Sequence, residues 1–404
     1  MHNMSKIIID EEKIDKFLER GVAEIFPSKK LLKEKLMSGA RLKIYQGFDP
    51  TGPYLHVGHA IGIRALKILQ ELGHEVIFLV GDFTSKVGDP DKGSTRIILT
   101  DEEIERNMSK WKEQAAQLIN FGGENPVRFE RNYKWLSKLK LDDILKLMSN
   151  FTLQQILQRD LFKKRLKEDL PLKLHEIVYP LMQGYDGVAM EVDIEIGGAD
   201  QIFNMLVGRD LSKIYLNKEK FVRANKMMDA PDGITMSKTK GNGINLGDNA
   251  EQMFGKAMSY PDTAILSGLE LLTEVSMKEI KNIEKEIKSG SNPMQFKKLM
   301  AYEIVKTIKG EKDAISAQDS WEKTFSRKEI PTEIEGVDVK KGELLVDVFL
   351  KEKIILSKSE FRRLIDERAI TNMDTKEKVT SQTEKVQNGV YKIGKKRFCK
   401  IKIK

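Results

Sequence analysis

The sequence predicts an α/β fold, in which a parallel sheet is followed by a helical region and a small basic module. Residues 42–48 and 75–80 are runs of large and β-branched residues typical of strands. Between them, apolar residues recur at helical spacing over residues 57–72, and Gly73 stands where a glycine often follows a helix. Because open parallel sheets are built from such strand–helix–strand units, we expect a Rossmann-type domain.

The rest of the predicted domain is assigned element by element. Residues 11–36 alternate apolar and charged side chains at a helical period, which predicts an N-terminal helical arm. Residues 101–118 and 142–170 are rich in Glu, Lys, Gln and Leu, and predict a largely helical segment over residues 101–170. A short strand is expected at residues 192–196, with a turn at 197–200 and a helix over 201–210.

The second half of the chain predicts a different organisation. Residues 220–245 contain Gly and Asp and predict loops, residues 250–308 predict helices, and residues 329–342 have the composition of a linker. We therefore expect three domains: a sheet-containing domain over residues 1–223, a helical domain over 224–335 and a basic module over 342–404.

Composition restricts the class of protein. Of the 404 residues, 40% are hydrophobic and 32% charged, and no apolar run is long enough to cross a membrane. The N-terminus lacks a signal-peptide core, since residues 7–9 are followed at once by acidic residues. The one cysteine, Cys399, excludes an intramolecular disulfide framework and a thiolate metal cluster. We expect a cytoplasmic protein with no metal ligands of its own.

The net charge of +8 is unevenly distributed. Residues 343–404 contain sixteen Lys and Arg but only nine Asp and Glu. An excess of this kind either binds a polyanion, above all nucleic acid, or only keeps the protein soluble. Charge alone leaves both open.

Two histidines mark the predicted start of the helix after the strand at residues 42–48. Because His56 and His59 are three residues apart, they project to the same side of the first turn, and Gly58 leaves room for a ligand. A helix N-terminus offers unpaired N–H groups and a positive dipole end to an anion. Two ordinary surface histidines are the alternative, but the strand-to-helix crossover favours a nucleotide site.

A second polar group lies in residues 178–186, VYPLMQGYD. On a helix, Tyr179, Gln183 and Asp186 lie four and three residues apart and share one face. A phenol, an amide and a carboxylate are suited to binding an amino acid by its ammonium group and a polar tip. The alternative is that these three residues only form the solvent-facing side of an amphipathic helix.

Two glycine-containing segments follow. In residues 196–201, IGGADQ, paired glycines let a backbone approach a ligand closely, although Asp200 alone could simply cap the next helix. Residues 235–242, TMSKTKGN, place a lysine among hydroxyl groups on a glycine-flanked loop, which suits the neutralisation of phosphate charge. Surface loops with lysines are common, so this segment indicates a phosphate site only through its order and spacing relative to HVGH.

Taken together, these segments resemble the bacterial tyrosyl-tRNA synthetases of the class I synthetase superfamily. HVGH resembles the family's HIGH signature, TMSKT its KMSKS signature, and VYPLMQGYD, IGGADQ and IFNMLVGRDL its tyrosine-pocket segments. SKSEFRRLIDERAI, near the C-terminal end, is similar to an S4 RNA-binding domain. The resemblance runs from residue 43 to the end in the family's order. It implies a HUP-type Rossmann domain, a helical domain and a small α+β S4 domain.

The resemblance also implies a two-step reaction. The carboxylate of L-tyrosine attacks the α-phosphorus of ATP bound with Mg²⁺, and the tyrosyl group then passes to the 3′ end of tRNA-Tyr. Because the nucleophile is already an anion, the first step depends on positioning and charge stabilisation more than on a protein acid or base. A homodimer without a tightly bound cofactor is implied as well.

Family roles are carried over to the matching residues. The implied tyrosine site consists of Tyr45 and Asp186 at the phenol, Asp89, Tyr179 and Gln183 at the ammonium group, and Gln201 near the carboxylate. The implied catalytic residues are Thr51, His56 and His59 at the ATP phosphates, and Lys92, Arg96, Lys238 and Thr239 at the departing pyrophosphate. The implied ATP pocket consists of Gly47, Asp49, Gly58, Gly198, Asp200, Met236, Ser237 and Lys238. Arg362 and Arg363 are the implied RNA-binding residues.

Two features depart from the family pattern. Thr235 stands where KMSKS begins with lysine, and we hypothesise that Lys240 supplies the missing charge. In the C-terminal module, residues 369–374, AITNMD, lack the usual glycine-containing turn around the asparagine.

Three other functions remain as alternatives. A tryptophanyl-tRNA synthetase would share the fold and signatures but lack the S4 domain and the phenol-binding aspartate. A small-molecule adenylyltransferase would be shorter, without the paired loop and RNA module. A silent paralogue would only bind RNA. For the expected dimer, the apolar faces around Phe151, Leu153, Ile156 and Leu157 fit an interface or an intramolecular core equally well.

Overall fold

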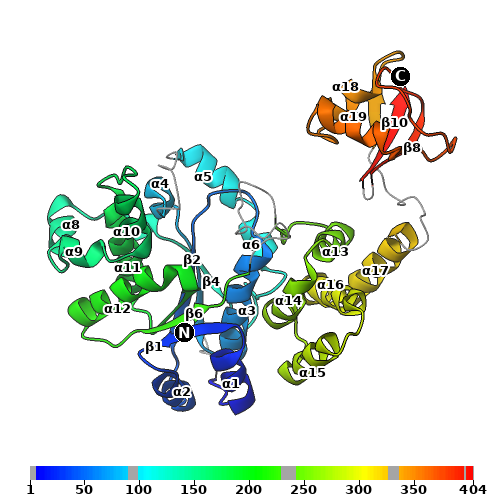
Figure 1. Ribbon diagram of the computed structural model, residues 1–404. Coiled ribbons are helices and arrows are strands. Elements are labelled where there is room, and N and C mark those ends of the chain that lie inside the picture. Colours follow the sequence, from blue (N-terminus) through cyan, green and yellow to red (C-terminus); the bar gives the residue numbers. More distant parts are fainter. Residues whose placement is uncertain (1–5, 90–98, 229–242, 326–335, 395–396, 404) are drawn as a thin grey trace. The chain divides into compact units, whose positions relative to one another are not determined.

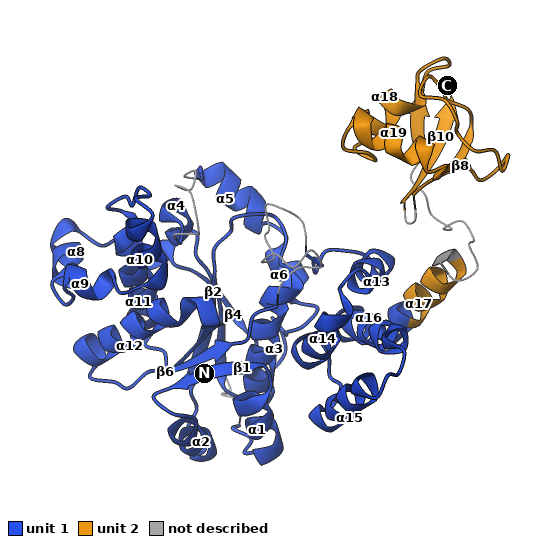
Figure 2. Ribbon diagram, viewed as in Figure 1, with its two compact units in different colours: residues 1–314 blue, residues 315–404 orange. Residues whose placement is uncertain are grey.

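The computed structural model describes residues 6–89, 99–228, 243–325, 336–394 and 397–403 (Figure 1). The chain divides into two compact units, Met1–Ala314 and Ile315–Lys404 (Figure 2). Within the described part of the chain, no helix combines the length and the apolar character needed to cross a membrane.

A six-stranded sheet forms the centre of the first unit, in the order β1-β6-β5-β2-β3-β4. Its strands are β1 (Val22–Phe26), β2 (Lys43–Phe48), β3 (Glu75–Val80), β4 (Arg128–Arg131), β5 (Ile194–Gly198) and β6 (Phe221–Asn225). All neighbouring pairs are parallel except β1 with β6 at one edge. The predicted α/β class is confirmed.

The predicted strand–helix–strand unit is present as β2, α3 and β3. β2 pairs with β3 in parallel register from Lys43 opposite Glu75 to Phe48 opposite Val80. The helix α3 (Val57–Glu71) has His56 as its N-cap residue. Gly73, with a φ of +87°, reverses the chain after the last turn, a conformation that glycine adopts without strain.

Helices cover both faces of the sheet, with α3 on one side and α11 and α12 on the other (Figure 1). The helices α1 to α12 of this region are α1 (Glu11–Glu19), α2 (Lys29–Met37), α3, α4 (Thr84–Val87), α5 (Asp101–Met108), α6 (Trp111–Ala115), α7 (Tyr133–Leu136), α8 (Leu141–Met148), α9 (Leu153–Ile156), α10 (Asp160–Lys167), α11 (Tyr179–Ala189) and α12 (Ile202–Leu216), with short 3₁₀ turns at Glu176–Val178 and Ala199–Gln201. The helix predicted for the VYPLMQGYD segment is therefore confirmed as α11.

Two predictions for the first half of the chain are wrong in part. Residues 11–36 do not form a continuous helical arm, because β1 separates α1 from α2, and Gly21 turns the chain with a φ of +64°. The insertion over residues 101–170 is not purely helical. Its strand β4 extends the sheet by pairing with β3, from Arg128 opposite Ile77 to Arg131 opposite Val80.

Two further predictions are wrong in the second half. Residues 220–245 begin with the strand β6 instead of a loop, so the expected domain boundary at residues 223–224 falls inside a strand of the sheet. The expected linker over residues 329–342 contains the strand β7 (Gly336–Val339), which pairs in parallel with β10 (Arg397–Ile403).

The predicted helical region over residues 250–308 is confirmed. It consists of α13 (Ala250–Met258), a 3₁₀ turn (Asp262–Ala264), α14 (Ile265–Leu272), α15 (Met277–Lys288) and α16 (Pro293–Lys309), followed by α17 (Glu311–Phe325). Apolar residues of α13, α14 and α16, among them Phe254, Leu269 and Ile304, are fully buried.

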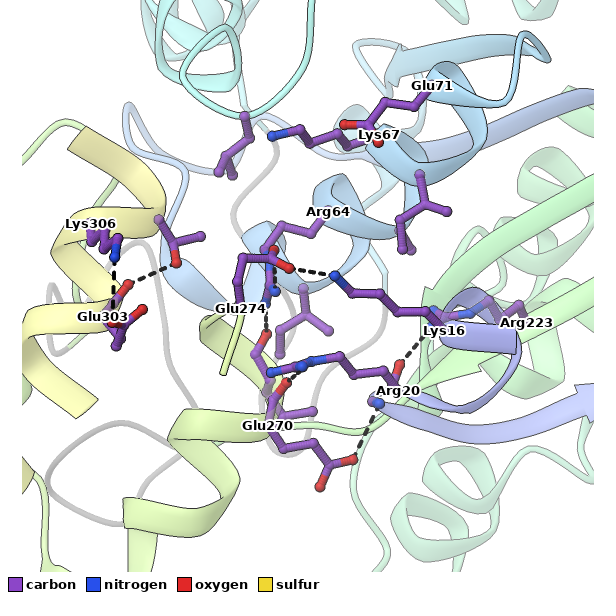
Figure 3. A pocket seen from close by; sticks show the side chains of 17 residues that line it. Lys16, Arg20, Arg64, Lys67, Glu71, Arg223, Glu270, Glu274, Glu303 and Lys306 are labelled. Atoms are coloured by element: carbon purple, nitrogen blue, oxygen red, sulfur yellow. Dashed lines mark hydrogen bonds and ion pairs between the residues drawn. The ribbon is translucent and has the colours of Figure 1, made fainter. Parts of the chain in front are cut away.

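A cavity of about 390 Å³ lies where α1 and α3 meet α14 and α16 (Figure 3). Arg20 donates hydrogen bonds to four backbone carbonyls at the C-terminal end of α14, those of residues 269, 270, 273 and 275, at 2.6–2.9 Å. Arg64 of α3 donates to the carbonyl of Leu271 at 2.6 Å and to the carboxylate of Glu274 at 2.7 Å. Because carbonyls at a helix end lack intrahelical partners, Arg20 binds the end of α14 to α1, and Arg64 binds it to α3, the helix that His56 caps.

The second unit contains a four-stranded sheet in the order β7-β10-β9-β8. Its further elements are α18 (Leu345–Lys351), α19 (Lys358–Asp366), β8 (Ile370–Asn372) and β9 (Gly389–Ile393). Phe349, Phe361 and Tyr391 lie in its core, together with the buried Cys399. This small α+β fold agrees with the class expected for the module.

Candidate active site

The two histidines of the HVGH segment lie together at the start of α3. Their ring centroids are 3.8 Å apart, and Nδ1 of His59 accepts a hydrogen bond of 3.0 Å from the backbone N–H of His56. The ring of His59 also packs edge-on against Phe48 at the end of β2, with the centroids 5.7 Å apart. One imidazole thus caps the helix, and both stand where an anion would meet its N-terminus.

A short backbone pairing joins this segment to the residues that follow the TMSKT segment. Val57 N–H donates to the carbonyl of Ile244 at 2.9 Å, and Leu246 N–H donates to the carbonyl of Leu55 at 2.7 Å. His56 and Asn245 form an antiparallel bridge between these two hydrogen bonds. The described chain that leaves the TMSKT segment is therefore anchored beside the histidines.

Asp49, directly after β2, connects three parts of the site. Its carboxylate accepts hydrogen bonds from the Tyr179 hydroxyl at 2.9 Å and from the Thr84 hydroxyl at 2.7 Å. The Thr51 N–H donates to the backbone carbonyl of Asp49 at 2.8 Å. A Cβ atom at Gly81 would lie 2.0 Å from Oδ1 of Asp49, so this close approach needs glycine.

Around Asp89, three side-chain oxygens converge on one amide nitrogen. Nδ2 of Asn204 donates to Oδ1 of Asp89 at 3.3 Å, to Oε1 of Gln183 at 3.0 Å and to Oε1 of Gln201 at 2.9 Å. Gln201 also donates to Oδ2 of Asp89 at 2.9 Å. The structure therefore brings the predicted residues Asp89, Gln183 and Gln201 together.

Asp89 is also balanced by a positive charge. Nη2 of Arg159 lies 2.7 Å from Oδ1 of Asp89, and the Arg159 side chain is only 7% exposed. Arg159 comes from the start of α10, in the connecting insertion. An arginine in this position compensates the charge of the partly buried carboxylate.

Tyr45 and Asp186 form a second, deeper group. Asp186 accepts hydrogen bonds from the indole N–H of Trp135 at 2.7 Å and from the amide of Asn132 at 3.1 Å. Burial raises the pKa of Asp186 well above its usual value, although these two donors oppose the shift. Burial and the charge of Glu195 likewise raise the pKa of Tyr45 well above its usual value.

The Tyr45 hydroxyl is buried and has no hydrogen bond of ordinary length among the described residues, although it lies close enough to the Glu195 carboxylate for that group to raise its pKa. Burying a hydroxyl without a partner costs about 1–3 kcal/mol. A ligand that offers a polar atom at this point recovers that cost.

The predicted glycines lie where a ligand would need backbone access. Gly47 is exposed although β2 is a central strand, so its face of the sheet is open there. Gly58 lies in the first turn of α3. A Cβ atom at Gly198 would lie 2.3 Å from Oδ1 of Asp200, which fixes glycine at the end of β5.

Several predicted residues lie outside the described residues. They are Lys92, Arg96, Thr235, Met236, Ser237, Lys238, Thr239 and Lys240. Their roles stay predictions. No group of three or more His, Cys, Asp or Glu suited to hold a metal ion occurs in the part of the chain that the structure describes.

Sequence comparison places this arrangement in a family. Residues 37–326 match the model of the tRNA synthetases class I (W and Y). The chain belongs to this family of class I tRNA synthetases. It is 36% identical over 397 residues to the tyrosine–tRNA ligase of Thermotoga maritima, with 97% of each chain covered. It is 40% identical over 399 residues to that of Carboxydothermus hydrogenoformans, with 95% of this chain and 96% of the relative covered.

Solved structures agree with this class I synthetase fold. A C-terminally truncated mitochondrial tyrosyl-tRNA synthetase of Aspergillus nidulans has a TM-score of 0.65 at 22% identity, covering 78% of this chain and 94% of that one. The tyrosyl-tRNA synthetase of Archaeoglobus fulgidus, solved with L-tyrosine, has a TM-score of 0.59 at 23% identity, covering 76% and 99%.

Seven further residues contact the predicted site residues or one another, and the sequence did not predict them. They are Thr84, Asn132, Trp135, Arg159, Glu195, Asn204 and Lys220, of which Lys220 pairs with Glu195. Asn204 had a signal, because it lies three residues after Gln201 at the start of the same helix. The others come from distant elements, and no spacing in the sequence marks them.

The apolar residues expected at a dimer interface have mixed positions. Ile156 is buried in an intramolecular cluster with Leu181 and Leu211, and Phe151 and Leu157 pack against that cluster. Leu153 is 56% exposed. The core interpretation therefore holds for three of the four residues.

In the C-terminal unit of the synthetase, Arg362 and Arg363 lie exposed on α19. Arg362 donates to Oε1 of Gln382 at 3.0 Å, and Nε of Arg363 lies 3.8 Å from Glu367. The turn that lacks the usual glycine is held by Asn372, whose side-chain oxygen accepts from the N–H groups of Asp374 and Thr375 at 3.1 and 3.4 Å. The asparagine side chain thus organises this turn directly.

Proposed function

We propose that this chain is a tyrosine–tRNA ligase, which activates L-tyrosine with ATP and transfers the tyrosyl group to the 3′ end of tRNA-Tyr. The buried Tyr45 hydroxyl carries this proposal, because it has no partner of its own among the described residues and its strand neighbour in β5 is Glu195, beside Gln183. A phenol-bearing amino acid offers the polar atom of its phenol to the Tyr45 hydroxyl and its ammonium group to the side-chain oxygen of Gln183.

The phenol end of the substrate is assigned to Tyr45 and Asp186. Trp135 and Asn132 fix the Asp186 carboxylate by two hydrogen bonds, so that it keeps one orientation. Phenylalanine would leave the buried Tyr45 hydroxyl without a hydrogen-bond partner and would offer no phenol to Asp186, and that cost is the physical basis of its rejection.

The ammonium end is assigned to Asp89, Tyr179 and Gln183, with Gln201 near the carboxylate. The amide of Asn204 has two hydrogens for three acceptor oxygens, which leaves acceptor capacity for an ammonium group. Tyr179 reaches Asp49, and so links the amino-acid site to the end of β2.

The ATP phosphates are assigned to the N-terminus of α3, with Thr51, His56 and His59. Donors aimed at the phosphoryl oxygens stabilise the charge that develops as pyrophosphate leaves. Gly47, Asp49, Gly58, Gly198 and Asp200 would line the nucleotide, and Lys92, Arg96 and the residues from Met236 to Thr239 would meet the pyrophosphate. Mg²⁺ would arrive with ATP.

The anticodon arm of the tRNA would contact the helical region from α13 to α17, over residues 250–325, and Arg362 and Arg363 would bind the tRNA from the C-terminal module. Both arginines are exposed, and they belong to the segment in which sixteen Lys and Arg outnumber nine Asp and Glu, an excess of positive charge that attracts a phosphate backbone. We place the enzyme in the cytoplasm, where its proposed tRNA partner is charged.

We also propose a homodimer. Leu141, Leu145 and Met148 lie on one stripe of α8 and are 69%, 55% and 38% exposed. A stripe of this kind is costly in water and is covered in a symmetric pair. Leu145→Glu is expected to give monomers in sedimentation equilibrium, whereas an unchanged dimer would place the interface elsewhere.

ATP–[³²P]pyrophosphate exchange with each of the twenty amino acids at equal concentration tests the proposed function. Exchange with tyrosine alone, followed by charging of tRNA-Tyr, is expected. Exchange with another amino acid would mean that the Tyr45 and Asp186 pocket has been assigned wrongly. No exchange would favour a silent paralogue or a loss caused by Thr235, and Thr235→Lys separates these two.

The proposed substitute for the missing lysine has its own test. If Lys240 supplies the charge absent at Thr235, both Lys240→Ala and Lys238→Ala lower the exchange rate. An unchanged rate in Lys240→Ala, with collapse in Lys238→Ala, would disprove the substitution.

A further inference from the structure

A buried ion pair lies behind the proposed ammonium site. Lys220, directly before β6, and Glu195, in β5, have side chains that are 0% and 3% exposed, with Nζ bonded to Oε2 of Glu195. The other carboxylate oxygen of Glu195 accepts a hydrogen bond of 3.1 Å from Nε2 of Gln183. The pair is therefore connected to a residue that we assign to substrate binding.

Glycines on two helices make the space for this ion pair. A Cβ atom at Gly208 of α12 would lie 2.4 Å from Nζ of Lys220, and one at Gly187 of α11 would lie 3.2 Å from it. α11 and α12 also approach closely at Gly184, where a Cβ atom would lie 3.0 Å from Cα of Gly208. The local sequence thus leaves room for the lysine head group between the helices and the sheet.

Stability alone is a weak reason for such a pair. Removing two charges from water is costly, and apolar side chains of similar volume are often as stabilising in the same place. Polar pairs kept in a core commonly fix one arrangement of their neighbours, and here the neighbour is the amide of Gln183.

The Gln183 amide could in principle present either its oxygen or its nitrogen to the substrate. An ionised carboxylate only accepts hydrogen bonds, so Glu195 requires the NH₂ group of Gln183 on its own side. The oxygen of Gln183 then faces the opposite side, where it accepts from Asn204 at 3.0 Å. That orientation adds an acceptor to the oxygens of Asp89 and Gln201.

We propose that Lys220 and Glu195 are positioning residues for tyrosine recognition: Lys220 holds the Glu195 carboxylate in place, and Glu195 turns the oxygen of Gln183 toward the substrate ammonium group. The proposal rests on the assignment of Gln183 to the ammonium group. Without Lys220, the Glu195 carboxylate loses the partner that fixes it and no longer holds the NH₂ group of Gln183, so the amide turns that group toward the cation. The substrate then loses an acceptor and meets a donor.

Inhibitors with and without an ammonium group test this role. Tyramine keeps the phenol and the ammonium group, whereas 3-(4-hydroxyphenyl)propionate keeps the phenol and the carboxylate. Both are used as competitors of tyrosine in pyrophosphate exchange, with wild type, Lys220→Met and Lys220→Met/Glu195→Gln.

In Lys220→Met, we expect the KM for tyrosine and the Ki for tyramine to rise about tenfold or more, while kcat and the Ki for 3-(4-hydroxyphenyl)propionate stay within about threefold. A loss of folded protein would instead lower kcat and leave the KM and both Ki values unchanged. Equal weakening of both inhibitors, or no weakening of tyramine, would overturn the proposal.

The double variant carries the test if the single variant does not fold, because it leaves no unpaired charge. The amide that Glu195→Gln introduces can donate or accept, so we expect a smaller but still selective weakening of tyramine. Tyramine binding at the wild-type level would overturn the proposal here.

Lys218→Met is the matched control. Lys218 lies two residues earlier and pairs with Asp193 at 2.8 Å, but its side chain is 32% exposed and its ion pair does not involve Glu195. We expect wild-type values for both inhibitors. Wild-type exchange with tyrosine is measured first, so that a failure of the proposed function is distinguished from a failure of this inference.

Discussion

The Tyr179 hydroxyl donates a hydrogen bond of 2.9 Å to Oδ2 of Asp49. Tyr179 belongs to the first turn of α11, and Asp49 follows the last residue of β2. The bond therefore joins the helix assigned to tyrosine recognition to the strand end assigned to ATP. The Thr84 hydroxyl holds the other oxygen of the same carboxylate.

Loss of this hydrogen bond is expected to weaken the binding of both tyrosine and ATP. Tyr179→Phe removes the donor to Asp49 and a proposed ammonium contact, and hydrogen bonds to charged groups contribute about 1.5–3 kcal/mol. We expect the KM for tyrosine to rise about tenfold and the KM for ATP to rise by a smaller factor. Tyr302→Phe, on α16, is the control in pyrophosphate exchange. If the KM values for tyrosine and ATP both stay unchanged in Tyr179→Phe, the assignment of Tyr179 is contradicted.

Selectivity against phenylalanine is expected to depend on Tyr45. Tyr45→Phe removes a buried hydroxyl that has no partner among the described residues. The variant loses the penalty that phenylalanine meets in the wild type, so the ratio of kcat/KM for tyrosine over phenylalanine falls, by about tenfold. Competition between the two amino acids in exchange measures the ratio, and an unchanged ratio would remove Tyr45 from the phenol site.

The imidazole of His56 is expected to act in the transition state. His56→Ala lowers kcat for exchange about 100-fold with the KM for tyrosine within about threefold, since one donor to the developing charge is lost. Lys67→Ala, an exposed position on the same helix, leaves both values unchanged. A proportional rise in the KM would assign His56 to ground-state binding instead.

Acid stability is expected to depend on His74. Burial lowers the pKa of His74 from 6.5 to about 4, and its Nδ1 accepts a hydrogen bond of 3.2 Å from the Leu42 N–H. Because the folded state disfavours the protonated ring, stability is complete above pH 6.5 and is lost as the pH falls toward 4. The loss is about 3 kcal/mol. His74→Gln keeps a hydrogen-bond acceptor, and in this variant the thermal unfolding midpoint is expected to depend less on pH between 6.5 and 4. A pH dependence equal to that of the wild type would contradict the lowered pKa of His74.

Binding of tRNA is expected to depend on the exposed arginines of α19. Arg362→Gln/Arg363→Gln raises the KM for tRNA about tenfold and reduces the salt dependence of binding by about two in the slope of log K against log salt. Tyrosine-dependent pyrophosphate exchange is the internal control and stays at the wild-type level. An unchanged KM for tRNA would place RNA binding on other residues.

Local patterns predicted the elements that carry a dense local signal. The α11 helix was predictable because Tyr179, Gln183 and Asp186 share one face, and α3 because its apolar residues recur between His56 and Gly73. β1 was hidden among charged residues, although Gly21 and Pro27 flank it and could have marked a break.

Long-range partners account for what could not be predicted. β6 contains the buried Arg223, whose guanidinium group donates hydrogen bonds to the backbone carbonyls of Phe17 and Arg20, at the end of α1. The burial of Arg159 is likewise explained by its ion pair with Asp89, and the burial of Lys220 by its ion pair with Glu195. A charged residue in a sequence predicts a surface, and only its partner explains its burial.

β1 is the first strand of the sheet to leave the ribosome, and its partner β6 is the last. Val22 lies opposite Asn225, and Phe26 opposite Val222. A nascent chain that has just completed β5 therefore exposes the edge of β5 and an unpaired β1, both open to pairing with other chains. Formation of β6 closes the sheet and also binds the end of α1 through Arg223. Assembly of the whole sheet is thus delayed until more than half of the polypeptide has been translated.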